Sequence, residues 1–191
     1  MKIQAVVFTR ANTYEVRELT LPEPGAANIT VRTLVSAISP GTERWTLRGK
    51  HIGTAFPCVP GYHRIGVVEA CGRDVTEFEP GDVVYGTAGS WKETDVISMW
   101  GAHVGGSVSK PAGYNLISST MPHAFELETL SFTILAGVAN RGVNALEINP
   151  TERVLIIGAG IIGICAAQLC ALRGAGAILL EKDAERREFV Q

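Results

Sequence analysis

The 191-residue chain is 46% apolar and 19% charged, and its formal net charge at pH 7 is −2. This apolar content excludes an intrinsically disordered chain, and the near-neutral charge argues against a nucleic-acid partner, because phosphate neutralisation requires a basic surface. The length allows one large domain or two small ones with cores of their own.

Short strands separated by turns are predicted for residues 1–120. Turn residues such as Asn12-Thr13 and Pro80-Gly81-Asp82 separate short apolar runs, and no long helical periodicity interrupts these runs. The predicted strands are Gln4–Phe8, Tyr14–Leu19, Asn28–Ser36, Ile65–Cys71 and Asp82–Tyr85. This region is therefore predicted to form a small β barrel or sandwich.

Residues 121–191 follow a different pattern. Apolar residues at helical spacing predict a helix over Glu126–Leu146, with a break near Gly137 or Gly142. The further predicted elements are a strand over Val154–Ile157, a helix over Ile161–Leu172, a strand over Ala177–Leu180 and a helix over Asp183–Val190. Strands that are apolar on both faces are typical of a parallel sheet, so the second domain is predicted to be α/β.

The residues Gly158-Ala159-Gly160-Ile161-Ile162-Gly163 form a G-x-G-x-x-G pattern between a predicted strand and a predicted helix. In this context the pattern indicates a site for the pyrophosphate of a dinucleotide. Gly158 would allow the tight turn, Gly160 would let the backbone approach the phosphates, and Gly163 would let the helix pack closely on the sheet. The alternative is a buried unit whose glycines serve packing only.

Glu181 ends the second predicted strand of this unit, where a ribose-binding carboxylate is expected. Its carboxylate could accept hydrogen bonds from both ribose hydroxyls and would repel a 2′-phosphate. We therefore expect NAD rather than NADP as the cofactor, although the cationic Lys182 that follows weakens this preference. The candidate cofactor-binding residues are Gly158 to Gly163, Glu181 and Lys182.

The apolar stretch Val154–Leu172 is long enough to span a bilayer, which leaves a membrane helix as an alternative. The β-branched run and the glycines in its first half favour strand, turn and helix instead. The stretch Met1–Arg10 is too short and too soon interrupted to be a signal peptide, and the four cysteines contain no C-x-x-C pair. We expect a cytoplasmic protein with reduced thiols and no membrane partner.

Three stretches together resemble the medium-chain dehydrogenase/reductase family. They are Pro40–Glu43, Val59–Val84 with its Gly61-Tyr62-His63 and Pro80-Gly81-Asp82 phrases, and Val154–Arg187. The resemblance implies a GroES-like β barrel followed by a Rossmann domain, and hydride transfer between a nicotinamide and a secondary alcohol or ketone. Within the family, Ser39–Trp45 is most similar to the subgroup containing 2-desacetyl-2-hydroxyethyl bacteriochlorophyllide a dehydrogenase.

The family's zinc ligands are replaced in this chain. Pro40 stands at the cysteine position, Tyr62 at the histidine and His63 at the glutamate, and residues 86–120 contain no cysteine for a structural zinc. His63 and His103 alone are too few for a site that needs three or four ligands. We therefore expect no zinc.

The resemblance implies three candidate catalytic residues. Thr42 matches the hydroxyl that takes the substrate proton, but it could instead cap a helical turn. The Tyr62 phenol could polarise a carbonyl oxygen and the His63 imidazole could exchange protons, or Tyr62 could simply fill the space that zinc vacates.

Two residues near the candidate catalytic positions are expected to be structural. Glu43 is expected to pair with its neighbour Arg44. His103 is also expected to be structural rather than part of the site.

Three functions remain open at this stage. The first is an NAD(P)-dependent alcohol or ketone oxidoreductase with a small-molecule substrate, and the second is a quinone or enone reductase, which the loss of zinc ligands favours. The third is a chain with little or no catalysis, because the predicted Rossmann domain is incomplete after two strands. In that case Val154–Ile157 and Ala177–Leu180 would expose apolar surface that favours a homodimer.

Overall fold

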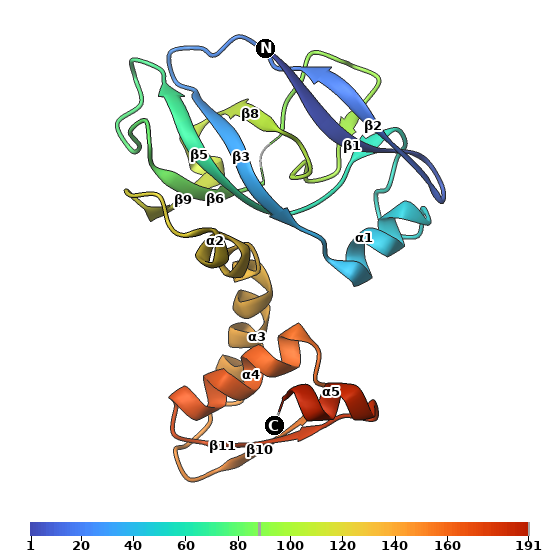
Figure 1. The fold of residues 1–191 in the computed structure, drawn as a ribbon, viewed down its shortest axis with the longest axis vertical. Coiled ribbons are helices and arrows are strands. Elements are labelled where there is room, and N and C mark those ends of the chain that lie inside the picture. The colour runs from blue at the N-terminus through green and yellow to red at the C-terminus, as the bar shows by residue number, and fades with distance from the viewer. Residues whose placement is uncertain (88, 191) are drawn as a thin grey trace. The chain divides into compact units, whose positions relative to one another are not determined.

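A computed structural model describes residues 1–87 and 89–190 (Figure 1). The chain divides into two compact units, Met1–Ser131 and Phe132–Gln191. Residues 121–131, which the sequence predicts as part of the second domain, lie with the first unit because helix α2 (Ala124–Leu130) packs against strand β3 (Ile29–Ala37).

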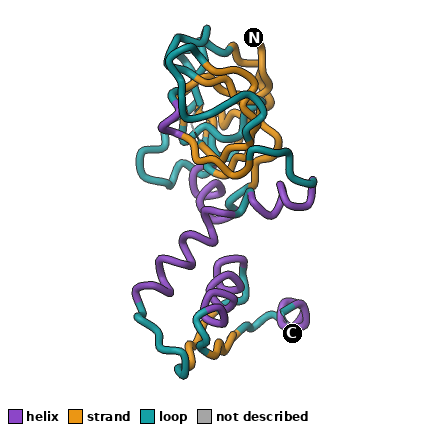
Figure 2. The backbone as a smooth tube through the Cα atoms, turned by 90° about the vertical axis from the view of Figure 1, so that its left-hand side faces the viewer, coloured by secondary structure: helices purple, strands orange, loops and turns teal. Residues whose placement is uncertain are grey.

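The N-terminal unit is built from two sheets, in agreement with the predicted barrel or sandwich. One has the strand order β8-β3-β5-β6-β9 and the other β2-β1-β4-β7. Figure 2 shows how closely these strands are grouped. Besides β3, the strands are β1 (Lys2–Arg10), β2 (Thr13–Thr20), β4 (Cys58–Val59), β5 (His63–Cys71), β6 (Val83–Gly86), β7 (Ile97–Ser98), β8 (Gly106–Ser109) and β9 (Tyr114–Ser118). All five predicted strands are present.

The core of this unit follows from the alternation of apolar residues along the strands. On β1, Ile3, Ala5 and Val7 are buried, and they pack with residues of the loops and of β8. A second cluster forms around Ile29 and Val31 of β3. A short helix, α1 (Pro40–Leu47), follows β3, and the 3₁₀ turn η1 (Pro111–Gly113) precedes β9.

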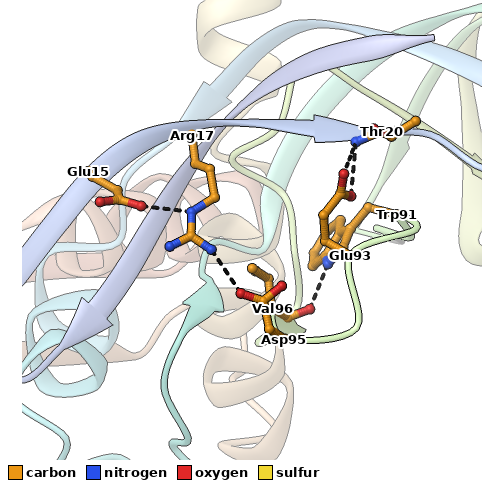
Figure 3. A network of polar contacts seen from close by, with 7 residues as sticks. All are labelled: Glu15, Arg17, Thr20, Trp91, Glu93, Asp95 and Val96. Carbon is orange, nitrogen blue, oxygen red and sulfur yellow. Dashed lines mark hydrogen bonds and ion pairs between the residues drawn. The ribbon is translucent and has the colours of Figure 1, made fainter.

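The loop between β6 and β7 is held against β2 by the contacts in Figure 3. Both carboxylate oxygens of Glu93 accept hydrogen bonds from the Thr20 backbone N–H, at 3.0 and 2.9 Å. Trp91 Nε1 donates to the Val96 carbonyl at 2.6 Å. The hydrogen bonds from Thr20 lower the pKa of the Glu93 carboxyl, so the anion that holds this loop persists at neutral pH.

The C-terminal unit contains a parallel pair of strands with helices against it. Its elements are α3 (Thr133–Ala145), β10 (Arg153–Ile157), α4 (Ile161–Leu172), β11 (Gly176–Leu180) and α5 (Ala184–Phe189). β10 pairs with β11 in parallel, from Arg153 opposite Gly176 to Ile157 opposite Leu180. This is the predicted strand–turn–helix–strand order, with α4 against both strands.

The predicted helix over Glu126–Leu146 is divided, but not at the expected glycines. The break lies at Ser131 and Phe132, between α2 and α3. The buried Ser131 side chain donates to the Glu128 carbonyl, a local hydrogen bond that competes with helix continuation. Gly137 and Gly142 continue α3 because an isolated glycine weakens a helix without breaking it.

Among the described residues, only one face of the two C-terminal strands is covered by other parts of the chain. Val154 and Ile156 pack with Cys170 of α4, whereas Leu155 is 61% and Ile157 79% exposed. The predicted apolar exposure is therefore present. The homodimer that this exposure favours stays a prediction.

The membrane alternative for Val154–Leu172 is wrong. This stretch divides into β10, the glycine turn and α4. Among the residues that the structure describes, no helix has the length and apolar character needed to span a bilayer.

Candidate cofactor site and hydroxyl cluster

The glycine-rich turn joins β10 to α4 in the geometry that the sequence predicts. Gly158 has φ +101°, a conformation that a residue with a side chain rarely adopts, and its N–H donates to the Leu180 carbonyl at 2.8 Å. α4 begins at Ile161 without a side-chain cap. The first N–H groups of a helix have no partner within the helix, so this end can bind an anion.

The three glycines of the turn have different structural requirements. A Cβ atom on Gly163 would lie 2.0 Å from the Gly158 carbonyl oxygen, so close packing of helix and turn requires glycine there. Gly160 has an ordinary φ of −80°, and a Cβ on it would meet no atom within 4 Å. The chain's own packing therefore explains Gly158 and Gly163 but not Gly160, beside which there is open space.

The residues between these glycines differ in exposure. Ala159 is buried, whereas Ile161 and Ile162 are 42% and 44% exposed. The turn is thus not filled by its own side chains, and the binding of a dinucleotide there stays a prediction.

Glu181 follows the end of β11 and is tied to the same turn. Its Oε2 accepts from the Ala159 N–H at 2.8 Å and its Oε1 from the Asp183 N–H at 3.0 Å. These hydrogen bonds, with the nearby Arg186 guanidinium, lower the pKa of the Glu181 carboxyl to about 2. The carboxylate is anionic at neutral pH, as ribose binding requires, and Lys182 beside it is exposed. Hydrogen bonding of Glu181 to a ribose stays a prediction.

We predict that Glu181 makes the C-terminal unit sensitive to acid. A carboxyl whose pKa is lowered by folding stabilises the fold above its usual pKa of 4.5, and this stabilisation is lost as pH falls through about 2. Amide hydrogen exchange of α4 and β11 should therefore accelerate between these pH values once the intrinsic pH dependence is subtracted. Glu181→Gln should flatten this acceleration. An identical profile in the variant would contradict the assignment.

Tyr62 lies in a cluster of hydroxyl groups at the start of α1. Its phenolic oxygen is 2.6 Å from Ser39 Oγ and 3.2 Å from Thr42 Oγ1. Its ring contacts those of His63, with centroids 4.3 Å apart, and Trp100, with centroids 5.3 Å apart. The structure thus brings together Thr42 and Tyr62 and adds Ser39, which sequence reasoning missed.

The Thr42 hydroxyl does not cap a turn. The N-cap of α1 is Ser39, and no side-chain hydrogen bond caps this helix. The alternative proposed for Thr42 from the sequence is therefore not found.

His63 is fully buried at the start of β5. Neither ring nitrogen has a hydrogen-bond partner of ordinary geometry among the described residues. Burial lowers the pKa of this imidazole and outweighs the attraction of Glu43, so the ring is neutral. A neutral, enclosed imidazole is a poor acid or base for an external substrate, and the predicted role of His63 gains no support.

Glu43 and His103 form a second polar contact, which sequence reasoning missed. Glu43 Oε2 is 2.7 Å from His103 Nε2, and Glu43 Oε1 accepts from the Ser39 N–H at 2.8 Å. The expected pairing of Glu43 with Arg44 is thus wrong, since the buried carboxylate turns inward to a histidine 60 residues away. Gly61 (φ +94°) makes room for this pair, because a Cβ there would lie 2.6 Å from the His103 ring.

The residues at the family's zinc positions do not fit zinc. Pro40 has no donor atom, the Tyr62 oxygen is engaged with two hydroxyl groups, and His63 is enclosed. Within residues 1–87 and 89–190, no three histidine, cysteine, aspartate or glutamate side chains gather as a metal site. A zinc site needs three or four such ligands, so we derive no step through a metal.

Comparison with known proteins shows similarity to alcohol dehydrogenases. Residues 25–114 match the family model of the alcohol dehydrogenase GroES-like domain. The chain is also 24% identical, over 168 residues, to the class-3 alcohol dehydrogenase of Zea mays. Residues 25–114 are thus similar to the alcohol dehydrogenase GroES-like domain, and the longer alignment is to an alcohol dehydrogenase.

Solved structures of medium-chain dehydrogenases share the fold. One from Sinorhizobium meliloti 1021, described as a zinc-binding dehydrogenase bound to NADP, matches with a TM-score of 0.82 and 22% identity over 100% of this chain. A quinone oxidoreductase of Pseudomonas syringae pv. Tomato DC3000 matches with a TM-score of 0.74 and 21% identity over 98% of this chain. These matches confirm the predicted order of a GroES-like domain and a Rossmann-type α/β unit.

The chain covers only part of these medium-chain dehydrogenase/reductase relatives. The match spans 82% of this chain but 44% of the maize enzyme, and the two solved structures are covered to 59% and 55%. The chain therefore spans about half the length of the relatives that it matches.

Proposed function

We propose that this chain functions in an NAD(P)-dependent oxidoreductase that transfers hydride between a nicotinamide and a secondary alcohol or its ketone. The observation that carries the proposal is Gly160. Neither its backbone angle nor its surroundings require glycine, yet it is the N-cap of α4, at the position where a diphosphate would approach the backbone. The similarity of residues 25–114 to the alcohol dehydrogenase GroES-like domain supports the same conclusion.

In this proposal the glycine-rich turn binds and orients the cofactor. The N–H groups at the start of α4 bind the pyrophosphate, and the Glu181 carboxylate accepts hydrogen bonds from the ribose hydroxyls. An anionic Glu181 disfavours a 2′-phosphate, which supports NAD over NADP. The bound nicotinamide supplies the hydride chemistry, and the protein orients the reactants and excludes water.

The hydroxyl cluster holds the proton that the reaction exchanges. Tyr62 Oη donates to or takes a proton from the substrate oxygen, and its phenolate form can accept hydrogen bonds from Ser39 Oγ and Thr42 Oγ1. Both hydroxyls are held by the first turn of α1. This arrangement replaces the role of zinc in polarising the substrate oxygen, and we propose a zinc-free enzyme on this basis.

The substrate and compartment are also proposals. The likeness of Ser39–Trp45 to the bacteriochlorophyllide dehydrogenase subgroup supports a secondary alcohol. The four free cysteines support a cytoplasmic location, where thiols are kept reduced.

A second candidate is reduction of a quinone or an activated C=C bond. It is favoured by the poor fit of the Tyr62 site to zinc and by the quinone oxidoreductase among the structural neighbours. Consumption of NADH with 1,4-benzoquinone, but with no ketone, would select this candidate. Failure to bind NADH at all would leave a chain without catalysis.

Gly160→Ala tests the cofactor site with little risk to the fold. Its Cβ meets no atom of the chain, so the unfolding free energy should fall only by the roughly 0.5–1 kcal/mol that alanine costs relative to glycine at an N-cap. A methyl group in the phosphate contact costs about 1–3 kcal/mol. We expect the dissociation constant for NADH, measured by nicotinamide fluorescence, to rise about tenfold or more. Gly137→Ala is the matched control, because its Cβ is equally free and lies in α3. Equal NADH affinity in both variants would contradict the assignment.

A further inference from the structure

The N-terminal unit contains a largely apolar cavity of about 650 Å³. Its size is within the range of small-molecule sites. The apolar part of the lining comes from β1, β2, α1 and the segments beside them: Val6, Phe8, Tyr14, Ile38, Leu47 and Val104. Ser36, Glu43, Arg44 and His103 also line the cavity. An apolar cavity with a few converging polar groups is the usual form of a ligand or reaction site.

Three of these polar residues form one hydrogen-bonded chain. Ser36 Oγ is 3.0 Å from His103 Nδ1, and His103 Nε2 is 2.7 Å from Glu43 Oε2. The side chains of His103 and Glu43 are 7% and 5% exposed. These two hydrogen bonds connect the end of β3 and α1 through His103, which lies in the segment before β8.

The Glu43 carboxylate determines the tautomer of the imidazole. An ionised carboxylate accepts hydrogen bonds only, and Glu43 already accepts one from the Ser39 N–H. In the neutral imidazole, Nε2–H therefore donates a hydrogen bond to Glu43, and the lone pair of Nδ1 is directed at the Ser36 hydroxyl. In that form Ser36 is the donor to Nδ1, so a base contacts its proton.

We propose that Ser36, His103 and Glu43 form a nucleophile, base and carboxylate triad that hydrolyses esters of small apolar acyl groups without a nicotinamide. The two distances fall within the range of an activated serine, and such triads are defined by geometry rather than by sequence position. The apolar lining is suited to an alkyl or aryl acyl chain. This activity is separate from the proposed oxidoreductase.

The reaction balances with water as the second reactant. Ser36 Oγ bonds to the acyl carbon while its proton moves to His103 Nδ1. The bond to the leaving alcohol breaks, and that alcohol takes the proton from Nδ1. Water then attacks the acyl-serine, gives a proton to Nδ1 and releases the carboxylic acid, after which Ser36 regains its proton.

The cavity also contains a cation for the negative charge that develops on the carbonyl oxygen. Arg44 lines the cavity with an exposed side chain. A positive charge near a carbonyl oxygen stabilises the oxyanion that develops on it.

The test is hydrolysis of p-nitrophenyl acetate and butyrate by the full chain without nicotinamide. We expect catalysis above the buffer rate, and a loss of about 100-fold or more in Ser36→Ala and in Glu43→Gln. Ser90→Ala is the matched control, because Ser90 also hydrogen-bonds within the same unit but lies outside the cavity. Its rate should equal that of the unaltered chain.

Covalent labelling gives a readout that does not depend on turnover. A fluorophosphonate should modify Ser36 at one group per chain, as located by mass spectrometry, and tryptophan fluorescence should show that Ser36→Ala remains folded. Hydrolysis no faster than buffer, hydrolysis unchanged in Ser36→Ala, or labelling at another residue would each overturn the proposal. A purely structural role for the three residues predicts no hydrolysis and no labelling.

Discussion

Gly163→Ala is expected to destabilise the C-terminal unit by about 3 kcal/mol. The new Cβ would lie 2.0 Å from the Gly158 carbonyl oxygen, and because this neighbour is backbone, α4 or the turn itself would have to move. Overpacking at a rigid contact costs about 1–3 kcal/mol, and the additional displacement of the turn favours the upper end of this range. The same displacement should also weaken NADH binding.

Hydrogen exchange is the suitable measurement for this variant. All tryptophans and tyrosines lie within residues 1–131, so intrinsic fluorescence reports on the N-terminal unit only. Protection of the amides of β10, α4 and β11 should fall in Gly163→Ala. It should be kept or slightly raised in Gly137→Ala, because alanine is the better helix former. Equal protection in the two variants would show that helix and turn are not in close contact.

His103→Leu is expected to cost the N-terminal unit about 3 kcal/mol or more. The substitution leaves the Glu43 carboxylate buried without its histidine, and removing one partner of a buried pair costs about 3–5 kcal/mol. Urea unfolding followed by tryptophan fluorescence measures the loss.

The double variant Glu43→Leu/His103→Leu separates the pair from simple packing. Replacing both partners with apolar residues removes the buried Glu43 carboxylate that would otherwise lack a partner. The loss of unfolding free energy in the double variant should therefore be smaller than the sum of the losses in the two single variants. The Ser39 N–H loses its acceptor in the double variant, so recovery should be incomplete. Additive losses would mean that Glu43 and His103 do not interact.

The C-terminal elements could be predicted from sequence because their signals are local. The predicted helix over Ile161–Leu172 has the bounds of α4, since an apolar strand and a glycine turn precede it directly in the chain. The division between α2 and α3 could not be found in the same way. It depends on a side-chain hydrogen bond of Ser131. In a sequence, a serine indicates a helix break less strongly than the nearby glycines do.

The polar sites show the same difference between local and distant signals. The glycine-rich turn is one continuous motif and was found, whereas the contacts of Ser39 with Tyr62 and of Glu43 with His103 join residues 23 and 60 positions apart. No spacing rule predicts such pairs. The family resemblance directed attention to Thr42 and Tyr62 but gave no reason to select Ser39 or His103.

Gly61 carries a consequence for how variation in this chain should be interpreted. It contributes no reactive atom, yet any larger residue there would displace the imidazole beside it and strain the backbone next to Tyr62. One substitution at this position would thus disturb the phenol cluster and the buried histidine together. A loss of activity caused at Gly61 would resemble the removal of two chemical groups, although neither had been altered.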